Sequence, residues 1–143
     1  MQQRTERSIA QWQALMETGE VRAVEIVAHY LARIDAVDRA GPTLRWVLEV
    51  NPEAVAIAAA LDDERRRTGP RGPLHGIPLL IKDNIDTGDR LTTTAGSLAL
   101  EGHRAPRDAF LVARQRAAEL MAACEATAAA ARRSIRGRLE AAR

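Results

Sequence analysis

Lysine occurs once in this chain of 143 residues, at position 82. The other 20 of the 21 cationic side chains are all arginines. Lys82 ends the most hydrophobic run in the sequence, residues 77–81, and Asp83 and Asn84 follow it. Arginine keeps its proton at any useful pH, whereas a lysine in a dry site can become a neutral base. The placement suggests proton transfer by Lys82, although spacing alone favours a plainer interpretation, a charged residue that ends a buried strand.

Other side chains that could carry chemistry are few. Cys124 is the single cysteine, so the sequence predicts neither an internal disulfide nor a cysteine-based metal site. The three histidines show no metal-ligand spacing, and His75, between a leucine and a glycine, is interpreted as structural rather than as a base. We therefore expect no metal site and no cofactor.

Hydrophobic periodicity and capping residues predict the elements that must position Lys82. Ser8 and Gln11 form a capping-box pattern before a helix that Gly19 ends. The remaining expected elements are a helix over 22–39, a strand over 44–50, a helix from Asn51-Pro52 to about Arg67, and a strand over 77–82 buried on both faces. A loop over 83–97, with a further strand near 90–94 as an alternative, and a helix capped by Asp108 complete the pattern, which indicates an α/β fold.

Residues 72–97 read GPLHGIPLLIKDNIDTGDRLTTTAGS. This segment resembles the amidase signature family, whose members carry a G-P-L-H-G-I-P-V-L-I-K-D-N-like stretch followed by a T-T-A-G-S-like loop. The resemblance extends over about residues 1–118, which are expected to form a partial amidase domain. It implies the N-terminal fragment of an amidase-type α/β/α sandwich, helix-rich and with a mixed sheet.

The resemblance also implies a chemistry. Members of the family hydrolyse or transfer carboxylic amides with a serine nucleophile, a second serine on a cis peptide bond, and a lysine, whose match here is Lys82. The residues that match beside it are expected to support the site by hydrogen bonds: Asp83, Asn84, Thr93, Thr94, Gly96 and Ser97. The alternative for Asp83 and Asn84 is a turn that leaves a strand, and the hydroxyls of residues 92–97 could equally satisfy nearby backbone groups.

Residues 119–143 depart from the family's pattern, because no glycine- and serine-rich segment follows Ala118. The three serines of the chain are Ser8, Ser97 and Ser134, and none has the setting of a nucleophile. The alanine-rich composition favours a continuous helix from Asp108 to about Arg136, so 119–143 is predicted to be a helical or disordered tail outside the family. The change of character suggests a truncated or rearranged chain.

Composition limits the partners. The net charge of +2 lies entirely in residues 119–143, with five arginines against three glutamates, which is weak evidence for nucleic acid. No signal peptide or membrane span is predicted, and a cytoplasmic location is expected.

Two function hypotheses remain: a segment of an amidase that acts on a small-molecule amide when a second chain completes it, or a non-catalytic remnant or helical interaction module. Unpaired strand edges and exposed apolar faces predict marginal stability and self-association.

Overall fold

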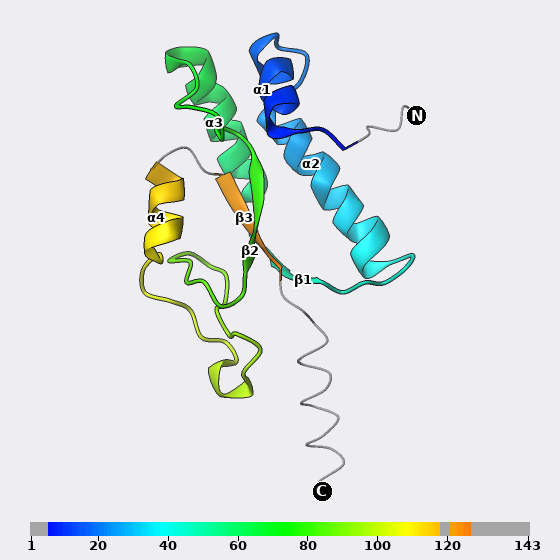
Figure 1. The fold of residues 1–143 in the computed structure, drawn as a ribbon, viewed down its shortest axis with the longest axis vertical. Helices are drawn as coiled ribbons and strands as arrows, with labels where there is room; N and C mark the ends of the chain where they lie inside the picture. Colours follow the sequence, from blue (N-terminus) through cyan, green and yellow to red (C-terminus); the bar gives the residue numbers. More distant parts are fainter. Residues whose placement is uncertain (1–5, 118–120, 127–143) are drawn as a thin grey trace, which may run out of the picture.

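The computed structural model describes residues 6–117 and 121–126, and for 121–126 it describes the backbone. The chain order is helix, helix, strand, helix, strand, helix, strand (Figure 1). The bounds are α1 Ile9–Glu17, α2 Ala23–Arg33, β1 Val47–Val50, α3 Ala54–Thr68, β2 Pro78–Lys82, α4 Phe110–Ala117 and β3 Met121–Ala126. A π-helical turn, Ile34–Arg39, extends α2, and a 3-10 turn, Leu98–Leu100, lies between β2 and α4.

The first helix begins where its capping residues predict. The Ser8 side chain accepts the Gln11 backbone N–H, and the Gln11 side chain accepts the Ser8 backbone N–H, which completes the capping box. The expected helix over 22–39 is confirmed as α2 followed by the π-helical turn. In that turn Asp38 is buried, and its carboxylate accepts the N–H groups of Trp46 and Val47 at the start of β1.

The described sheet is mixed, with the strand order β1-β3-β2. β3 pairs antiparallel with β1, where Val50 lies opposite Cys124, and parallel with β2, where Lys82 lies opposite Ala126. The mixed sheet confirms the expected fold class, and β3 joins the two strands that the sequence predicted over 44–50 and 77–82.

The predicted continuous helix from Asp108 to Arg136 is wrong over Met121–Ala126, which form the central strand of this sheet. Alanine favours a helix as an intrinsic preference, but pairing with a strand on either side overrides it. Residues 127–136 of that prediction lie outside the described residues. The alternative strand near 90–94 is also wrong, because this segment is a loop.

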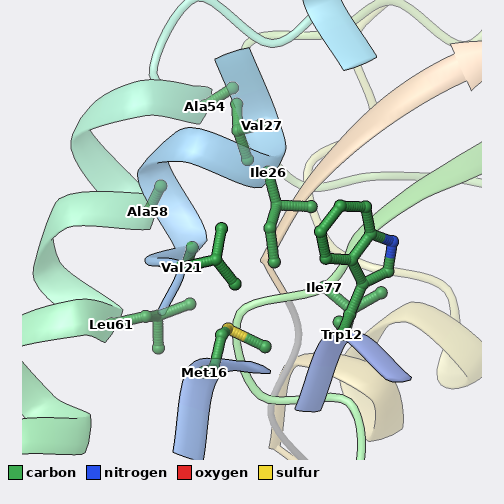
Figure 2. Packing of buried hydrophobic residues seen from close by; sticks show 10 residues of the cluster. Trp12, Met16, Val21, Ile26, Val27, Ala54, Ala58, Leu61 and Ile77 are labelled. Carbon is green, nitrogen blue, oxygen red and sulfur yellow. The ribbon is translucent and has the colours of Figure 1, made fainter. Parts of the chain in front are cut away.

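Helices α1, α2 and α3 share one hydrophobic core with the start of β2. Figure 2 shows Trp12 and Met16 of α1 directed toward Ile26 of α2, with Ile77 beside them. Trp12 also donates its indole N–H to the Tyr30 hydroxyl at 3.2 Å, so its one polar atom is satisfied. The buried members of the core are Trp12, Met16, Val21, Ala23, Ile26, Val27, Ala54, Ala58, Leu61 and Ile77.

A second, smaller cluster holds α4 against the end of β2. It consists of the buried residues Ile81, Leu91 and Val112, with Ile85 and Ala109 packed against them. Leu79 packs on the first core and Ile81 belongs to the second, whereas Leu80 between them is 61% exposed. Because side chains alternate along a strand, β2 has one covered face and one open face. The prediction that this strand is buried on both faces is wrong for the described residues.

Candidate active site

Lys82 lies at the carboxyl end of β2, and its side chain is exposed on the same open face as that of Leu80. Its carbonyl oxygen accepts the Ile85 N–H at 2.9 Å, which turns the chain at the strand end. The proton transfer that the sequence suggests for Lys82 requires a dry site, in which neighbouring residues keep water away from the amine. The described residues do not do so, because the side chain that ends the strand is exposed to solvent.

Asp83 differs from its neighbour because it is buried completely, with 0% exposure. Its carboxylate accepts the Thr94 backbone N–H and the Thr94 hydroxyl, both at 2.6 Å, and the Gly96 N–H at 3.3 Å. Its carbonyl oxygen accepts the Ala95 N–H at 2.8 Å. A buried carboxylate requires such donors, so Asp83 fixes the chain opposite it and, together with Asn84, also forms the turn that leaves the strand.

Residues 92–97, which we call the threonine loop, lie beside the strand end through these bonds. The structure therefore brings Asp83, Thr94 and Gly96 together, which is the arrangement expected of residues that support a site by hydrogen bonds. Thr93 is buried, and its N–H donates to the His103 carbonyl at 2.9 Å, away from Asp83. Ser97 accepts the Ala99 N–H as the cap of the 3-10 turn, and Asn84 is exposed.

Glu49 of β1 is bonded to the threonine loop of the candidate site, and the sequence did not single it out. Its two carboxylate oxygens accept the Thr92 N–H and the Thr92 hydroxyl, each at 2.8 Å. The only available signal was a single acid inside the predicted apolar strand 44–50, which on its own fits a solvent-facing position equally well. The threonine loop is thus attached to the sheet at two points.

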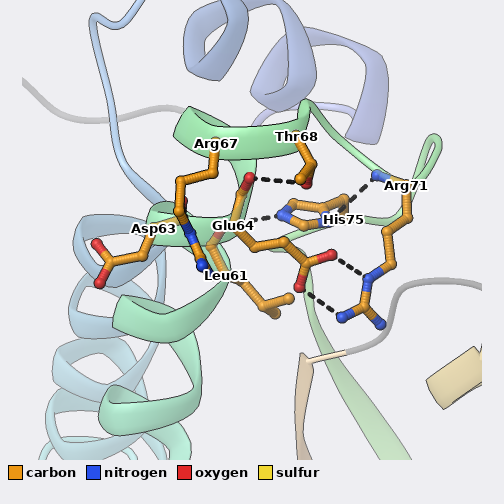
Figure 3. A network of polar contacts seen from close by, with 7 residues as sticks. All are labelled: Leu61, Asp63, Glu64, Arg67, Thr68, Arg71 and His75. Atoms are coloured by element: carbon orange, nitrogen blue, oxygen red, sulfur yellow. Dashed lines mark hydrogen bonds and ion pairs between the residues drawn. The ribbon is translucent and has the colours of Figure 1, made fainter.

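The loop that leads into β2 is attached to α3 through His75 (Figure 3). The imidazole is fully buried, with Nε2 at 2.9 Å from the Leu61 carbonyl and Nδ1 at 3.4 Å from the Arg71 N–H. A carbonyl accepts and an amide N–H donates, so the ring is the neutral Nε2–H tautomer. Arg71 adds an ion pair with Glu64, and its guanidinium holds the pKa of that carboxyl below the usual value. His75 is structural, as expected.

A second ionic contact attaches α4 to the loop after β2. Arg116 lies 2.5 Å from a carboxylate oxygen of Asp89 and 3.1 Å from one of Asp108. Burial alone would raise the pKa of Asp89, but the Leu91 N–H and the Arg116 guanidinium outweigh it, so the pKa is lowered. Asp108 also accepts the Gly88 N–H at 2.7 Å. The helix begins at Phe110, two residues beyond the predicted cap.

Within residues 6–117 and 121–126, no group of three or more acidic, histidine or cysteine residues could hold a metal ion. No helix in this part of the chain is both long enough and apolar enough to cross a bilayer.

Comparison with known proteins identifies the family to which this chain is similar. The family model described as amidase matches residues 25–131. A Schizosaccharomyces pombe protein named as a putative amidase is 46% identical over 111 residues, and one subunit of the glutamyl-tRNA(Gln) amidotransferase of Chloroflexus aurantiacus is 46% identical over 103 residues. The solved structure of the native peptide amidase from Stenotrophomonas maltophilia superimposes with a TM-score of 0.77 at 50% identity.

These matches cover most of this chain and a small part of each relative. They span 78%, 71% and 86% of the chain for the three proteins in turn, but 18%, 20% and 24% of the relatives themselves. The chain therefore corresponds to about a fifth to a quarter of the length of the proteins that it matches.

Proposed function

The chain belongs to the amidase family, and we propose that it supplies the lysine of a Ser–cis-Ser–Lys site that cleaves or transfers a carboxylic amide, completed by a further polypeptide segment. The observation that carries the proposal is the position of Lys82. The only lysine of the chain stands exposed at the end of β2, beside a threonine loop that two acids hold in place.

In the proposed reaction the Lys82 amine, in its neutral form, accepts a proton from the bridging serine. That serine takes the proton of the nucleophilic serine, whose oxygen attacks the amide carbonyl carbon. The C–N bond then breaks, the proton returns through the same relay to the leaving amine, and water or a second nucleophile releases the acyl group. Asp83, Asn84, Thr93, Thr94, Gly96 and Ser97 are proposed to support this site without touching the reacting atoms.

The serines of the described residues support a completed rather than a self-sufficient site. Ser8 caps α1, and the Ser97 hydroxyl accepts the Ala99 N–H, so both are engaged in local capping. Ser134, the third serine of the sequence, lies outside the described residues. Because the sequence around Ser134 has no glycine-rich turn that could expose a nucleophile, we propose that the nucleophile and the bridging serine come from a segment outside residues 1–143.

The substrate proposed is a small carboxylic amide, and the expected compartment is the cytoplasm. The names of the relatives, which are an amidase, a peptide amidase and one component of an amidotransferase, support amide chemistry without selecting one substrate.

The test is complementation. The chain is mixed with the separately expressed part of the Stenotrophomonas peptide amidase that it does not match, and aryl-amide cleavage is measured. Turnover is expected from the mixture and is expected to fall about 100-fold or more in Lys82→Ala, since that is the scale of general acid–base catalysis. Lys82→Arg, which keeps the charge and cannot become neutral, should fail equally. Turnover that survives both substitutions refutes the proposed role.

A second candidate, a non-catalytic interaction module, is favoured by the exposed apolar surface. Leu80 is exposed on the open face of the sheet, and Trp46 and Phe110 are also exposed. Sedimentation velocity of the pure chain separates the two candidates when combined with the assay above. Stable self-association with no turnover in any complementation mixture favours the module.

A further inference from the structure

Two acidic side chains hold alternate residues of the threonine loop with the same pattern of bonds. Asp83 accepts both the backbone N–H and the hydroxyl of Thr94, and Glu49 accepts both groups of Thr92. The four distances lie between 2.6 and 2.8 Å. Each threonine is thus fixed in backbone position and in side-chain rotamer by one carboxylate. We call these four residues the carboxylate clamp.

The carboxylate clamp and the contacts beside it together use every backbone donor in the loop. The N–H of Thr93 goes to the His103 carbonyl, those of Ala95 and Gly96 go to Asp83, and that of Ser97 goes to the Thr94 carbonyl. All six consecutive N–H groups of residues 92–97 are therefore donated, although the segment has no regular secondary structure. A loop bonded at every residue is pre-organised, and pre-organised loops are what rigid sites require.

The two acids come from distant parts of the sheet. Glu49 lies on β1, whereas Asp83 follows Lys82 at the end of β2, and β3 separates these strands. The loop consequently bridges the two outer strands of the described sheet at the end that carries Lys82. We propose that Glu49 is a positioning residue, which through Thr92 fixes the threonine loop and with it the surroundings of Lys82. Its relevance to catalysis depends on the proposed function, whereas the clamp itself does not.

The single lysine allows a direct test in the full chain. With lysine as the only isotope-labelled residue, one set of side-chain NMR signals reports on Lys82, and hydrogen exchange reports on residues 92–97. In Glu49→Gln, which keeps the shape and removes the charge, the exchange of these amides is expected to rise about tenfold or more, and the Lys82 signals are expected to shift. Thr92→Val should produce the same changes, and adding it to Glu49→Gln should produce little more.

Matched variants separate positioning from general stability. Thr92→Ser keeps both donors and should restore wild-type exchange and signals. Asp63→Asn removes an exposed acid of α3, which is paired with Arg66, and should leave both readouts unchanged. Unchanged exchange in Glu49→Gln, or faster exchange with unmoved Lys82 signals, overturns the proposal. If Glu49→Gln fails to fold, Thr92→Val decides alone. None of these readouts uses turnover, so a failed complementation assay does not affect them.

Discussion

Removing the buried carboxylate of Asp83 provides the strongest test of how the threonine loop is held against the end of β2. In Asp83→Ala, the Thr94 N–H and hydroxyl lose acceptors at 2.6 Å, and the Gly96 N–H loses one at 3.3 Å. The side chain is 0% exposed, so solvent screening does not weaken these bonds.

The magnitude follows from the bonds lost. A hydrogen bond to a charged group contributes roughly 1.5–3 kcal/mol, and two short ones are lost together. The Gly96 bond is long, and Gly96 retains the Thr94 hydroxyl at 3.3 Å, so it adds little. We expect a destabilisation of about 3–6 kcal/mol, a large fraction of a total that is typically about 5–15 kcal/mol.

Asp83→Asn separates charge from shape. The amide oxygen can still accept the Thr94 N–H, and the amide nitrogen can donate to the Thr94 hydroxyl oxygen, so the cost is expected to be about 1–2 kcal/mol. Thr94→Val removes the hydroxyl, which donates to Asp83 at 2.6 Å and accepts the Gly96 N–H at 3.3 Å, and should cost about 1.5–3 kcal/mol, mainly through the short bond.

Urea unfolding followed by the fluorescence of the buried Trp12 measures all three variants. With a slope of about 1–3 kcal/mol per molar urea, the alanine variant should lower the unfolding midpoint by about 1–6 M. A loss below about 1 kcal/mol for Asp83→Ala would refute the argument, because the carboxylate would then not hold the threonine loop.

Three further predictions concern other contacts. Gly76→Ala should lower the free energy of unfolding in urea by about 2–4 kcal/mol, because φ is +81° and the new Cβ would lie 2.9 Å from the Ala23 Cβ. The control Gly19→Ala has a similar φ of +75° but nothing within 4 Å of the new Cβ, so it should lower it by only about 1 kcal/mol. The pKa of Asp89 is lowered, so the stabilisation by its charge is fully present above about pH 4 and is lost as the pH falls through the pKa of the folded state. In Asp89→Asn, the melting temperature should therefore fall less steeply with decreasing pH in that acid range. An unchanged dependence of the melting temperature on pH would contradict the assignment. Leu80→Gln should leave stability within about 0.5 kcal/mol and reduce self-association in sedimentation velocity, and undiminished association would exclude the open face of β2 as the contact.

Local sequence signals predicted most of the helical part of this fold. The capping box at Ser8 and the apolar spacing from Val24 to Val37 determine α1 and α2 with few long-range contacts. Asn51 was predicted to cap the third helix, but α3 begins at Ala54 with Glu53 as its N-cap, and the Asn51 side chain accepts the Glu53 N–H in the turn that leads into the helix. These features depend on residues two to four apart, which the sequence displays directly.

Features that depend on distant residues were not predictable in the same way. β3 is alanine-rich, and only its pairing with β1 and β2 makes it a strand. The partner of Thr92 is Glu49, 43 residues earlier, and no local pattern connects them. From the sequence, the hydroxyls of Thr92 and Thr94 could either bond to nearby backbone groups or support the site. In the structure the Thr92 hydroxyl donates to Glu49 of β1, and the Thr94 hydroxyl donates to Asp83, which follows β2.

The contrast between Lys82 and Asp83 indicates how the two parts of the proposed site differ. The acid is already buried and hydrogen-bonded, whereas the amine beside it is exposed on an open face with Leu80. A lysine that exchanges protons with a serine must lose water, and an exposed side chain keeps it. In the proposed site, the described residues would provide the hydrogen-bonded surroundings, and the proposed serine-bearing segment would also have to cover the amine with apolar side chains. Acylation of the single lysine side chain should therefore be rapid in the free chain and slow in the complemented one, and equal rates would show that the added segment does not close over Lys82.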